Sequence, residues 1–328
     1  MAATRKGCLK LFLWFILADL LILFVIGQVY YSLGSNLVLY AFRDSKAPLE
    51  VKTRHGWRLV SEATLAEMGE ALVERHSEED FRWCSLPVRR KANTILQGLT
   101  STLFGGQMNI VTISPNRFQF MTSFQSSFAT TTAKERLNTD GLTFSIIANF
   151  HDPKGKPLGW VYHNGQQVNP SFKAWTGVFF VKEGRPYFGP KSLVDEVPGP
   201  IEEGTQGYPS VMKNHTIFGY VDQAPDRFFD GKKITYRSLA GMRRDGTAVF
   251  VLSGEGGALN VTEVAELARK LDVQHATLLD GGRALQYSIR TGPGQWHFQA
   301  FNTTLDFGPP FMRPQKSPVF IGVKPRTY

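Results

Sequence analysis

The segment HATLLDGGRALQY (275–287) combines residue types that could form a ligand site. Asp280 ends a short apolar run, and Gly281, Gly282 and Arg283 follow it directly. Consecutive glycines let the backbone adopt conformations that other residues avoid and approach a ligand closely. The segment is therefore either a plain turn or a site in which Asp280 faces a ligand.

The elements before this segment would carry it to a binding edge. The stretch 234–253 reads as two strands joined at Asp245–Gly246, and 260–273 has the apolar stripe of an amphipathic helix. Asn260 is the predicted N-cap of that helix, with Glu263 three residues later. Such strand–helix–strand units normally run their two strands parallel with a right-handed crossover.

Ligands of sheets with helical crossovers collect beyond the carboxyl ends of the parallel strands. One of the two loops at that edge follows Ser253, and the other begins at Asp280. Glu255 lies in the first of these loops, which is rich in glycine. We therefore expect Ser253, Glu255 and Asp280 to lie near one another.

Strand patterns also fill the part of the chain before these loops. Alternation of apolar and polar residues predicts strands at 108–114 and 118–124, and 142–150 reads as a further, apolar strand. Two β-hairpins are predicted, turning at Asn164–Gly165 and at Glu183–Gly184. The middle and the C-terminal third of the chain are thus rich in β-structure.

Blocks spread over this region, in this order, resemble one protein family. They are IIANFHDPKGKPLGWVYHNGQ (146–166), GVFFVKEGRPYF (177–188), GTQGYPSVMKN (204–214), YRSLAGMRRDGTAVFVLS (236–253) with ATLLDGGRALQY (276–287), and the closing RPQKSPVFIGVKPR (313–326). Over about residues 105–326 the chain resembles the phosphodiester glycosidases. This resemblance implies an α+β fold with a mixed β-sheet core and helices, and the release of a sugar from a sugar-1-phosphodiester.

The resemblance also implies roles for single residues. Glycosidic cleavage passes through an oxocarbenium-like state and usually uses paired carboxylates. Asp280, with Asp152 or Glu255, is implied to supply these carboxylates, and Arg237 to clamp the phosphate through two hydrogen bonds. The residues predicted to bind substrate are Asn149, Gln206, Gly281, Gly282 and Arg283.

Departures from the family pattern favour a second hypothesis. Ile147 stands where a gap-free match expects Asn, and Arg283 stands where the family has a small residue. The alternative function is a non-catalytic glycan-binding or envelope-assembly protein that keeps the fold. Asp152 precedes Pro153 and could equally begin a turn, and Arg237 could face the bulk surface.

The N-terminus has the pattern of a membrane anchor. Arg5, Lys6 and Lys10 precede an apolar run at residues 11–31. About 20 apolar residues span a bilayer core, and positive charges mark the cytoplasmic side. We therefore predict an uncleaved signal anchor with the remainder of the chain outside the cytoplasm; a cleaved signal peptide is the alternative. The bacterial members of the family imply the inner membrane and the periplasm.

Three domains follow from these patterns. The first, residues 1–33, would hold a cytoplasmic tip and the transmembrane signal anchor. The second, residues 34–104, would be a stalk or helical cap, because 61–80 has helical composition. The third, residues 105–328, would be the domain of phosphodiester-glycosidase type.

Composition limits the partners. The chain has 328 residues, with 37 Lys and Arg against 28 Asp and Glu, and a formal net charge of +9. A basic chain suits anionic partners. We find no nucleic-acid-binding motif, so the predicted partners are an anionic or phosphorylated glycan and, through residues 11–31, the membrane. No cofactor is predicted, and a divalent cation is left open.

Overall fold

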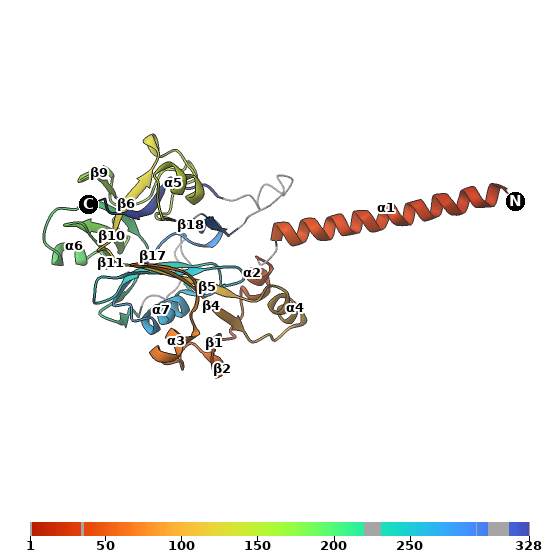
Figure 1. The fold of residues 1–328 in the computed structure, drawn as a ribbon, viewed down its shortest axis with the longest axis horizontal. Helices are drawn as coiled ribbons and strands as arrows, with labels where there is room; N and C mark the ends of the chain where they lie inside the picture. Colours follow the sequence, from red (N-terminus) through yellow and green to blue (C-terminus); the bar gives the residue numbers. More distant parts are fainter. Residues whose placement is uncertain (1, 34–35, 220–230, 293, 301–314, 328) are drawn as a thin grey trace. The chain divides into compact units, whose positions relative to one another are not determined.

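The computed structural model describes residues 2–33, 36–219, 231–292, 294–300 and 315–327. Contacts divide the chain into two units. The helix α1 (Ala2–Leu33) belongs to the first, and the other helices and strands belong to the second (Figure 1). Among the described residues, no helix is long and apolar enough to span a membrane. The membrane anchor therefore stays a prediction.

The second unit contains a large antiparallel sheet. Its strands follow the order β14-β13-β17-β15-β16-β5-β4-β1-β2, and β3 pairs with β4. Its strands are β1 (Leu49–Thr53), β2 (Gly56–Leu59), β3 (Val73–Glu78), β4 (Phe81–Arg90), β5 (Gln107–Ile113), β13 (Ser210–Lys213), β14 (Thr216–Ile217), β15 (Ser238–Met242), β16 (Ala248–Ser253) and β17 (His275–Leu278).

Two five-stranded sheets, also antiparallel, lie beside it in the same unit. One has the order β11-β10-β12-β8-β9 and the other β19-β18-β7-β20-β6. The first comprises β8 (Val161–His163), β9 (Gln166–Asn169), β10 (Gly177–Lys182), β11 (Arg185–Pro190) and β12 (Glu203–Gly207). The second comprises β6 (Phe118–Phe124), β7 (Phe144–Ile147), β18 (Gln286–Thr291), β19 (Gly294–Gln299) and β20 (Val319–Pro325).

Helices connect and cover these sheets, so the predicted α+β class is confirmed. Beyond α1 they are α2 (Leu37–Phe42), α3 (Leu65–Ala71), α4 (Ile95–Phe104), α5 (Ala133–Thr139), α6 (Leu193–Glu196) and α7 (Val261–Lys270). Two short 3₁₀ turns, η2 (Ser126–Phe128) and η3 (Gly282–Ala284), complete the set. Parallel pairing occurs in an isolated bridge between Gln107 and Gly256.

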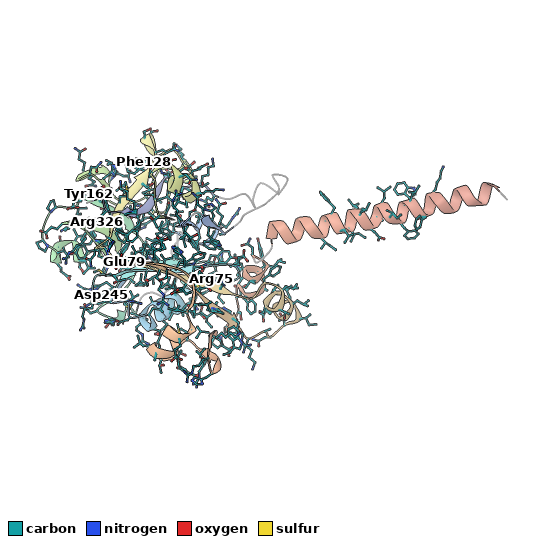
Figure 2. All side chains as sticks on the ribbon, in the orientation of Figure 1. Arg75, Glu79, Phe128, Tyr162, Asp245 and Arg326 are labelled. Carbon is teal, nitrogen blue, oxygen red and sulfur yellow. The ribbon has the colours of Figure 1, made fainter. Side chains whose placement is uncertain are left out.

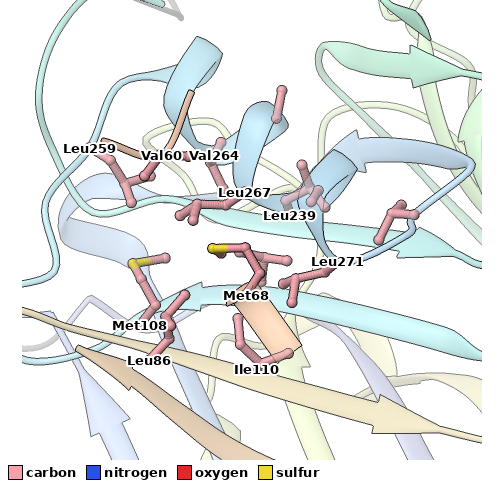
Figure 3. Packing of buried hydrophobic residues seen from close by; sticks show 14 of the residues in the cluster. Val60, Met68, Leu86, Met108, Ile110, Leu239, Leu259, Val264, Leu267 and Leu271 are labelled. Atoms are coloured by element: carbon pink, nitrogen blue, oxygen red, sulfur yellow. The ribbon is translucent and has the colours of Figure 1, made fainter. Parts of the chain in front are cut away.

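The main core lies where α7 packs on the large sheet (Figure 3). Val264, Leu267 and Leu271 of the α7 segment are buried in one cluster with Leu239 of β15 and Ile110 of β5. This is the apolar stripe predicted from the sequence. Because side chains four residues apart face the same side of a helix, the helix can bury all of them against one sheet face.

The start of α7 is fixed by the predicted cap. The Asn260 side chain accepts the Glu263 backbone N–H at 2.9 Å, and the Glu263 carboxylate accepts the Asn260 backbone N–H at 2.9 Å. This reciprocal capping box satisfies two backbone donors that the first turn would otherwise leave unpaired. It fixes the residue at which α7 begins.

The strand–helix–strand unit runs as predicted, with one addition. β15 lies between β16 and β17 and pairs antiparallel with both, so β16 and β17 point the same way. Their carboxyl ends therefore meet at one edge, and the first residue of β15 meets them there. The chain segment before β15 thus becomes part of the predicted site.

Two predicted hairpins are also confirmed. The turn between β8 and β9 has φ values of 50° at Asn164 and 78° at Gly165, and the turn between β10 and β11 has 50° at Glu183 and 69° at Gly184. Positive φ at both central positions is the geometry of the tight hairpin turn that matches strand twist.

The segment 34–104 differs from the expected stalk or helical cap. Within the predicted helical stretch 61–80, residues 73–78 form the strand β3 instead, and α3 covers only Leu65–Ala71. β3 pairs with β4, and β4 pairs with β5 of the large sheet. Backbone pairing with a neighbouring strand outweighs the weak helical preference of this polar, mostly exposed sequence.

Candidate functional site

Asp280 lies at the junction between two sheets. It follows the end of β17, and its backbone N–H donates to the Ala148 carbonyl, just after β7, at 3.1 Å. Its own carbonyl accepts a hydrogen bond from the Ser238 hydroxyl of β15 at 2.7 Å. Asp280 is only 6% exposed. The backbone on both sides therefore fixes where this carboxyl group sits.

Burial changes the acidity of Asp280. Removal from water raises its pKa to about 8, and one hydrogen bond opposes this shift. That bond is donated by the Gly281 backbone N–H to Asp280 Oδ1 at 2.8 Å. A carboxyl group with this pKa holds its proton at neutral pH, so it can act as a proton donor rather than as an anion.

The structure brings Ser253, Arg237 and the Asp280 loop together through their backbones. The Arg237 N–H donates to the Ser253 hydroxyl at 2.8 Å, and the Ser253 N–H donates to the Arg237 carbonyl at 2.9 Å. The neighbouring Tyr236 carbonyl accepts the Gly282 N–H at 2.8 Å. Of the predicted set, Ser253 and the Asp280 loop are therefore brought together at this sheet edge, and the place of Glu255 beside Asp280 stays a prediction.

The Arg237 side chain, by contrast, turns toward backbone carbonyls. It is 7% exposed, and its guanidinium donates to the Lys233 carbonyl at 2.8 Å and to the Leu259 carbonyl at 3.4 Å. Its charge is not among the causes of the Asp280 pKa shift. These bonds connect the loop before β15 to the loop before α7. The sequence predicted a phosphate clamp for Arg237 and did not predict this structural role.

The two glycines after Asp280 serve the chain itself. A Cβ on Gly281 would lie 2.9 Å from the Tyr236 carbonyl oxygen, and Gly282 has a φ of 59°. Their N–H groups donate to Asp280 Oδ1 and to the Tyr236 carbonyl. The glycines are needed for close backbone packing, and both N–H groups that were expected to face a ligand are already used.

Asn149, the residue after Ala148, contributes a buried acceptor. It is fully buried, and its amide nitrogen donates to the carbonyls of Leu158 at 3.0 Å and Gln206 at 2.9 Å. Its Oδ1 atom has no hydrogen-bond partner in the described structure. An unpaired buried acceptor costs about 1–3 kcal/mol, so its presence next to Ala148, which holds Asp280, marks a place for a donor such as a sugar hydroxyl.

Gln206 is a structural residue rather than a ligand contact. Its amide nitrogen donates to the carbonyls of Phe172 and Trp175 at 2.8 and 2.9 Å. Its Oε1 atom accepts the N–H groups of Trp160 and Phe172 at 3.1 and 2.9 Å. Because two donors and two acceptor positions are occupied, the side chain locks β12 to the 172–175 loop. The predicted substrate contact is corrected accordingly.

Asp152 also differs from its predicted catalytic role. Its Oδ1 atom accepts the backbone N–H groups of Lys154 and Lys156, both at 2.8 Å. Asp152 therefore begins a turn, which was the alternative that the sequence Asp152–Pro153 offered to a catalytic role. Arg283 lies on η3, and it is exposed.

Glu255 is exposed in the loop after Ser253, and its charge reaches a buried tyrosine that the sequence did not single out. Tyr287 donates its hydroxyl to the Ser253 carbonyl at 2.8 Å and accepts a hydrogen bond from Asn109 at 2.9 Å. Burial first, and the Tyr236 and Glu255 charges after it, raise the pKa of Tyr287 well above its ordinary value. The sequence contains this residue only as the last position of the segment 275–287, with no signal of its own.

No cluster of three or more His, Cys, Asp or Glu side chains that could hold a metal ion occurs in the part of the chain that the structure describes. The chemistry visible at this edge is that of a buried protonated carboxyl group, an unpaired amide oxygen and an exposed carboxylate.

Comparison with known proteins places the chain in one family. The sequence pattern of the phosphodiester glycosidase family matches residues 140–307, which include Asn149, Glu255 and Asp280. The chain belongs to the phosphodiester glycosidase family.

One solved structure supports the fold, and a second is similar over a shorter share of its own chain. The catalytic domain of zebrafish N-acetylglucosamine-1-phosphodiester alpha-N-acetylglucosaminidase, auto-inhibited by its pro-peptide, is similar with a TM-score of 0.59 and 14% identity, over 78% of this chain and 87% of that chain. A hypothetical protein from Synechocystis is similar with a TM-score of 0.49 and 15% identity, over 78% and 64% of the two chains. No curated protein sequence matches the chain.

Proposed function

We propose that this protein is a hydrolase that cleaves a glycosidic or sugar-1-phosphodiester bond in an envelope or exported polysaccharide. Membership of the family supports glycosidase-type chemistry. The observation that carries the proposal is the buried Asp280 carboxyl group with its pKa near 8. The unpaired Asn149 oxygen adds to it, because the Asp280 N–H bonds to Ala148, the residue before Asn149. A net positive chain charge suits an anionic glycan.

In the proposed reaction, Asp280 donates its proton to the oxygen that leaves the anomeric carbon. Water adds to that carbon and gives a proton to a second carboxylate, so the products are a free sugar and a phosphate monoester or a shortened glycan. Glu255, exposed and two residues after Ser253, is the proposed second carboxylate. Asn149 accepts a hydrogen bond from a sugar hydroxyl.

The full chain, purified in detergent and supplied with a chromogenic sugar-1-phosphodiester, is expected to release the chromophore. The measurement is the initial rate of release against substrate concentration. Binding without release, seen by calorimetry with the same compound, would instead support the non-catalytic glycan-binding function.

We propose further that α1 anchors the protein in a bacterial inner membrane with the second unit in the periplasm. What supports this is the apolar run of the sequence and the exposure of its large side chains, among them Trp14 at 73%, Phe15 at 65% and Leu23 at 64% (Figure 2). Exposed apolar side chains on all sides of a helix are stable only in an apolar surrounding.

An alkaline carbonate wash tests this attachment. Membranes from cells that express the full chain are expected to retain it, because the wash strips proteins held by charge alone. Recovery of the chain in the wash supernatant would contradict the anchor. Protease added to intact spheroplasts should then degrade residues beyond α1 only if they face the periplasm.

A further inference from the structure

Helix α4 has its apolar and polar faces inverted. Ile95, Leu96, Leu99 and Leu103 are 85%, 56%, 56% and 68% exposed. At about 100° per residue these four positions span only about 100° of the helix circumference, so they form one continuous face. A helix of a water-soluble domain normally turns such a face to the core.

The polar face of α4 is the one that is buried. Gln97 is 8% exposed and donates to the Ala41 carbonyl of α2 at 3.0 Å, while its Oε1 atom accepts the Asn93 N–H at 2.8 Å. Thr100 is 3% exposed and bonds within the helix to the Leu96 and Gln97 carbonyls. Specific hydrogen bonds therefore fix the orientation of α4, with its polar side buried and its apolar side exposed.

The neighbouring helix α2 adds one exposed aromatic side chain. α2 and α4 lie side by side (Figure 1), and Phe42 of α2 and Phe104 of α4 pack in one small cluster beneath them. On the outer side, Tyr40 of α2 is 55% exposed. We call Tyr40 with Ile95, Leu96, Leu99 and Leu103 the α2–α4 patch.

The surroundings of the α2–α4 patch point to one occupant. α2 begins at Leu37, only four residues along the chain from Leu33, the last residue of the proposed anchor. Exposed Arg43, Asp44 and Lys46 follow α2 with a net charge of +1. Exposed Lys91 precedes α4. Aliphatic side chains flanked by basic ones are the composition of a helix that lies in an anionic lipid interface.

We infer that the α2–α4 patch inserts its aliphatic side chains into the surface of the bilayer that holds α1, resting the domain on anionic lipid. The inference rests on the proposed anchoring of α1, although it adds a second, separate contact. The domain would then be held against the membrane at a fixed face rather than tethered by one helix, which would limit the distance from the bilayer at which it can meet a glycan.

The test places a fluorophore on each side of the domain. The full chain, with Cys8→Ser to leave only buried Cys84, is assembled at one copy per nanodisc of anionic lipid that carries a shallow nitroxide quencher. One label is attached at Thr102→Cys, an exposed polar position of α4. The other is attached at Arg244→Cys, beside Asp245 in the β15–β16 turn (Figure 2), at the end of β16 opposite to Ser253.

The Thr102 label is expected to be quenched at least about twofold more than the Arg244 label. Combining Ile95→Ser, Leu99→Ser and Leu103→Ser should reduce quenching at Thr102 to the Arg244 level, while far-ultraviolet circular dichroism stays unchanged because all three side chains are exposed. One copy per disc removes self-association as a cause.

The outcomes distinguish the anchoring of α1 from the lipid contact of the α2–α4 patch. If the chain stays with the discs and both labels are quenched equally, the patch does not touch lipid and the inference is overturned, while the anchor stands. If the chain does not stay with the discs, both the anchor and the inference are overturned. Neither outcome bears on hydrolysis, which is read with the chromogenic substrate.

Discussion

Replacing Asp280 with Asn is expected to lower kcat for a sugar-1-phosphodiester by about 10²–10⁴-fold, the usual contribution of a general acid. Asn keeps the shape of the side chain and can still accept the Gly281 N–H that now binds Oδ1 at 2.8 Å. It cannot give a proton to the leaving oxygen. With the pKa of Asp280 near 8, the wild-type rate is expected to fall as pH rises above about 8, and kcat against pH measures this.

Asp152→Asn is the matched control for this experiment. The sequence offered Asp152 as an alternative carboxylate, whereas the structure uses its Oδ1 to hold the turn through Lys154 and Lys156. An Asn side chain can accept the same two bonds, so kcat should change less than about twofold. If Asp152→Asn lowered kcat as much as Asp280→Asn does, the assignment of Asp280 as the general acid would be contradicted.

Local patterns were sufficient to predict the elements around Asp280. The β15–β16 turn, the cap of α7 at Asn260 and the run into Asp280 each depend on residues within a few positions of one another. The shared edge then follows from the handedness and direction of crossovers. For this reason the sequence alone was sufficient to predict that Ser253 lies near the Asp280 loop.

The roles of Asn149 and Gln206 could not be predicted in the same way. Both depend on hydrogen bonds between segments that are far apart in the sequence, such as the bond from Asn149 to the Gln206 carbonyl, 57 residues away. The sequence shows an amide side chain, but it does not show whether the amide nitrogen and the amide oxygen both already have hydrogen-bond partners. Gln206 is fully occupied and Asn149 is half occupied, and only the second can meet a ligand.

The inverted helix α4 shows the opposite limit of sequence analysis. Its spacing of aliphatic residues would predict a core-facing helix, since periodicity reveals a face but not the direction in which that face points. Burial of Gln97 and Thr100 sets the direction. The same reasoning explains β3, where a helical composition gave way to pairing with β4.

The same substitution at Asp280 is expected to stabilise the protein. The pKa of Asp280 is raised by burial from about 3.8 to about 8, so between these values the folded state holds a proton that the unfolded state has lost. Stability linked to this group is therefore complete below about pH 4 and falls by about 1.4 kcal/mol per pH unit as pH rises to about 8. Asn has no proton to lose and carries no such penalty.

Urea unfolding of wild-type protein and Asp280→Asn at several pH values measures this effect. The difference between the two free energies of unfolding should grow in favour of the variant by about 3 kcal/mol from pH 5 to pH 7, because all other titrating groups cancel in the difference. A difference that does not vary with pH would mean that Asp280 is ionised in the folded protein, and the general-acid role would lose its basis. A difference that grows as expected would show a buried carboxyl group that lowers stability near neutral pH in exchange for a proton held where the reaction needs it.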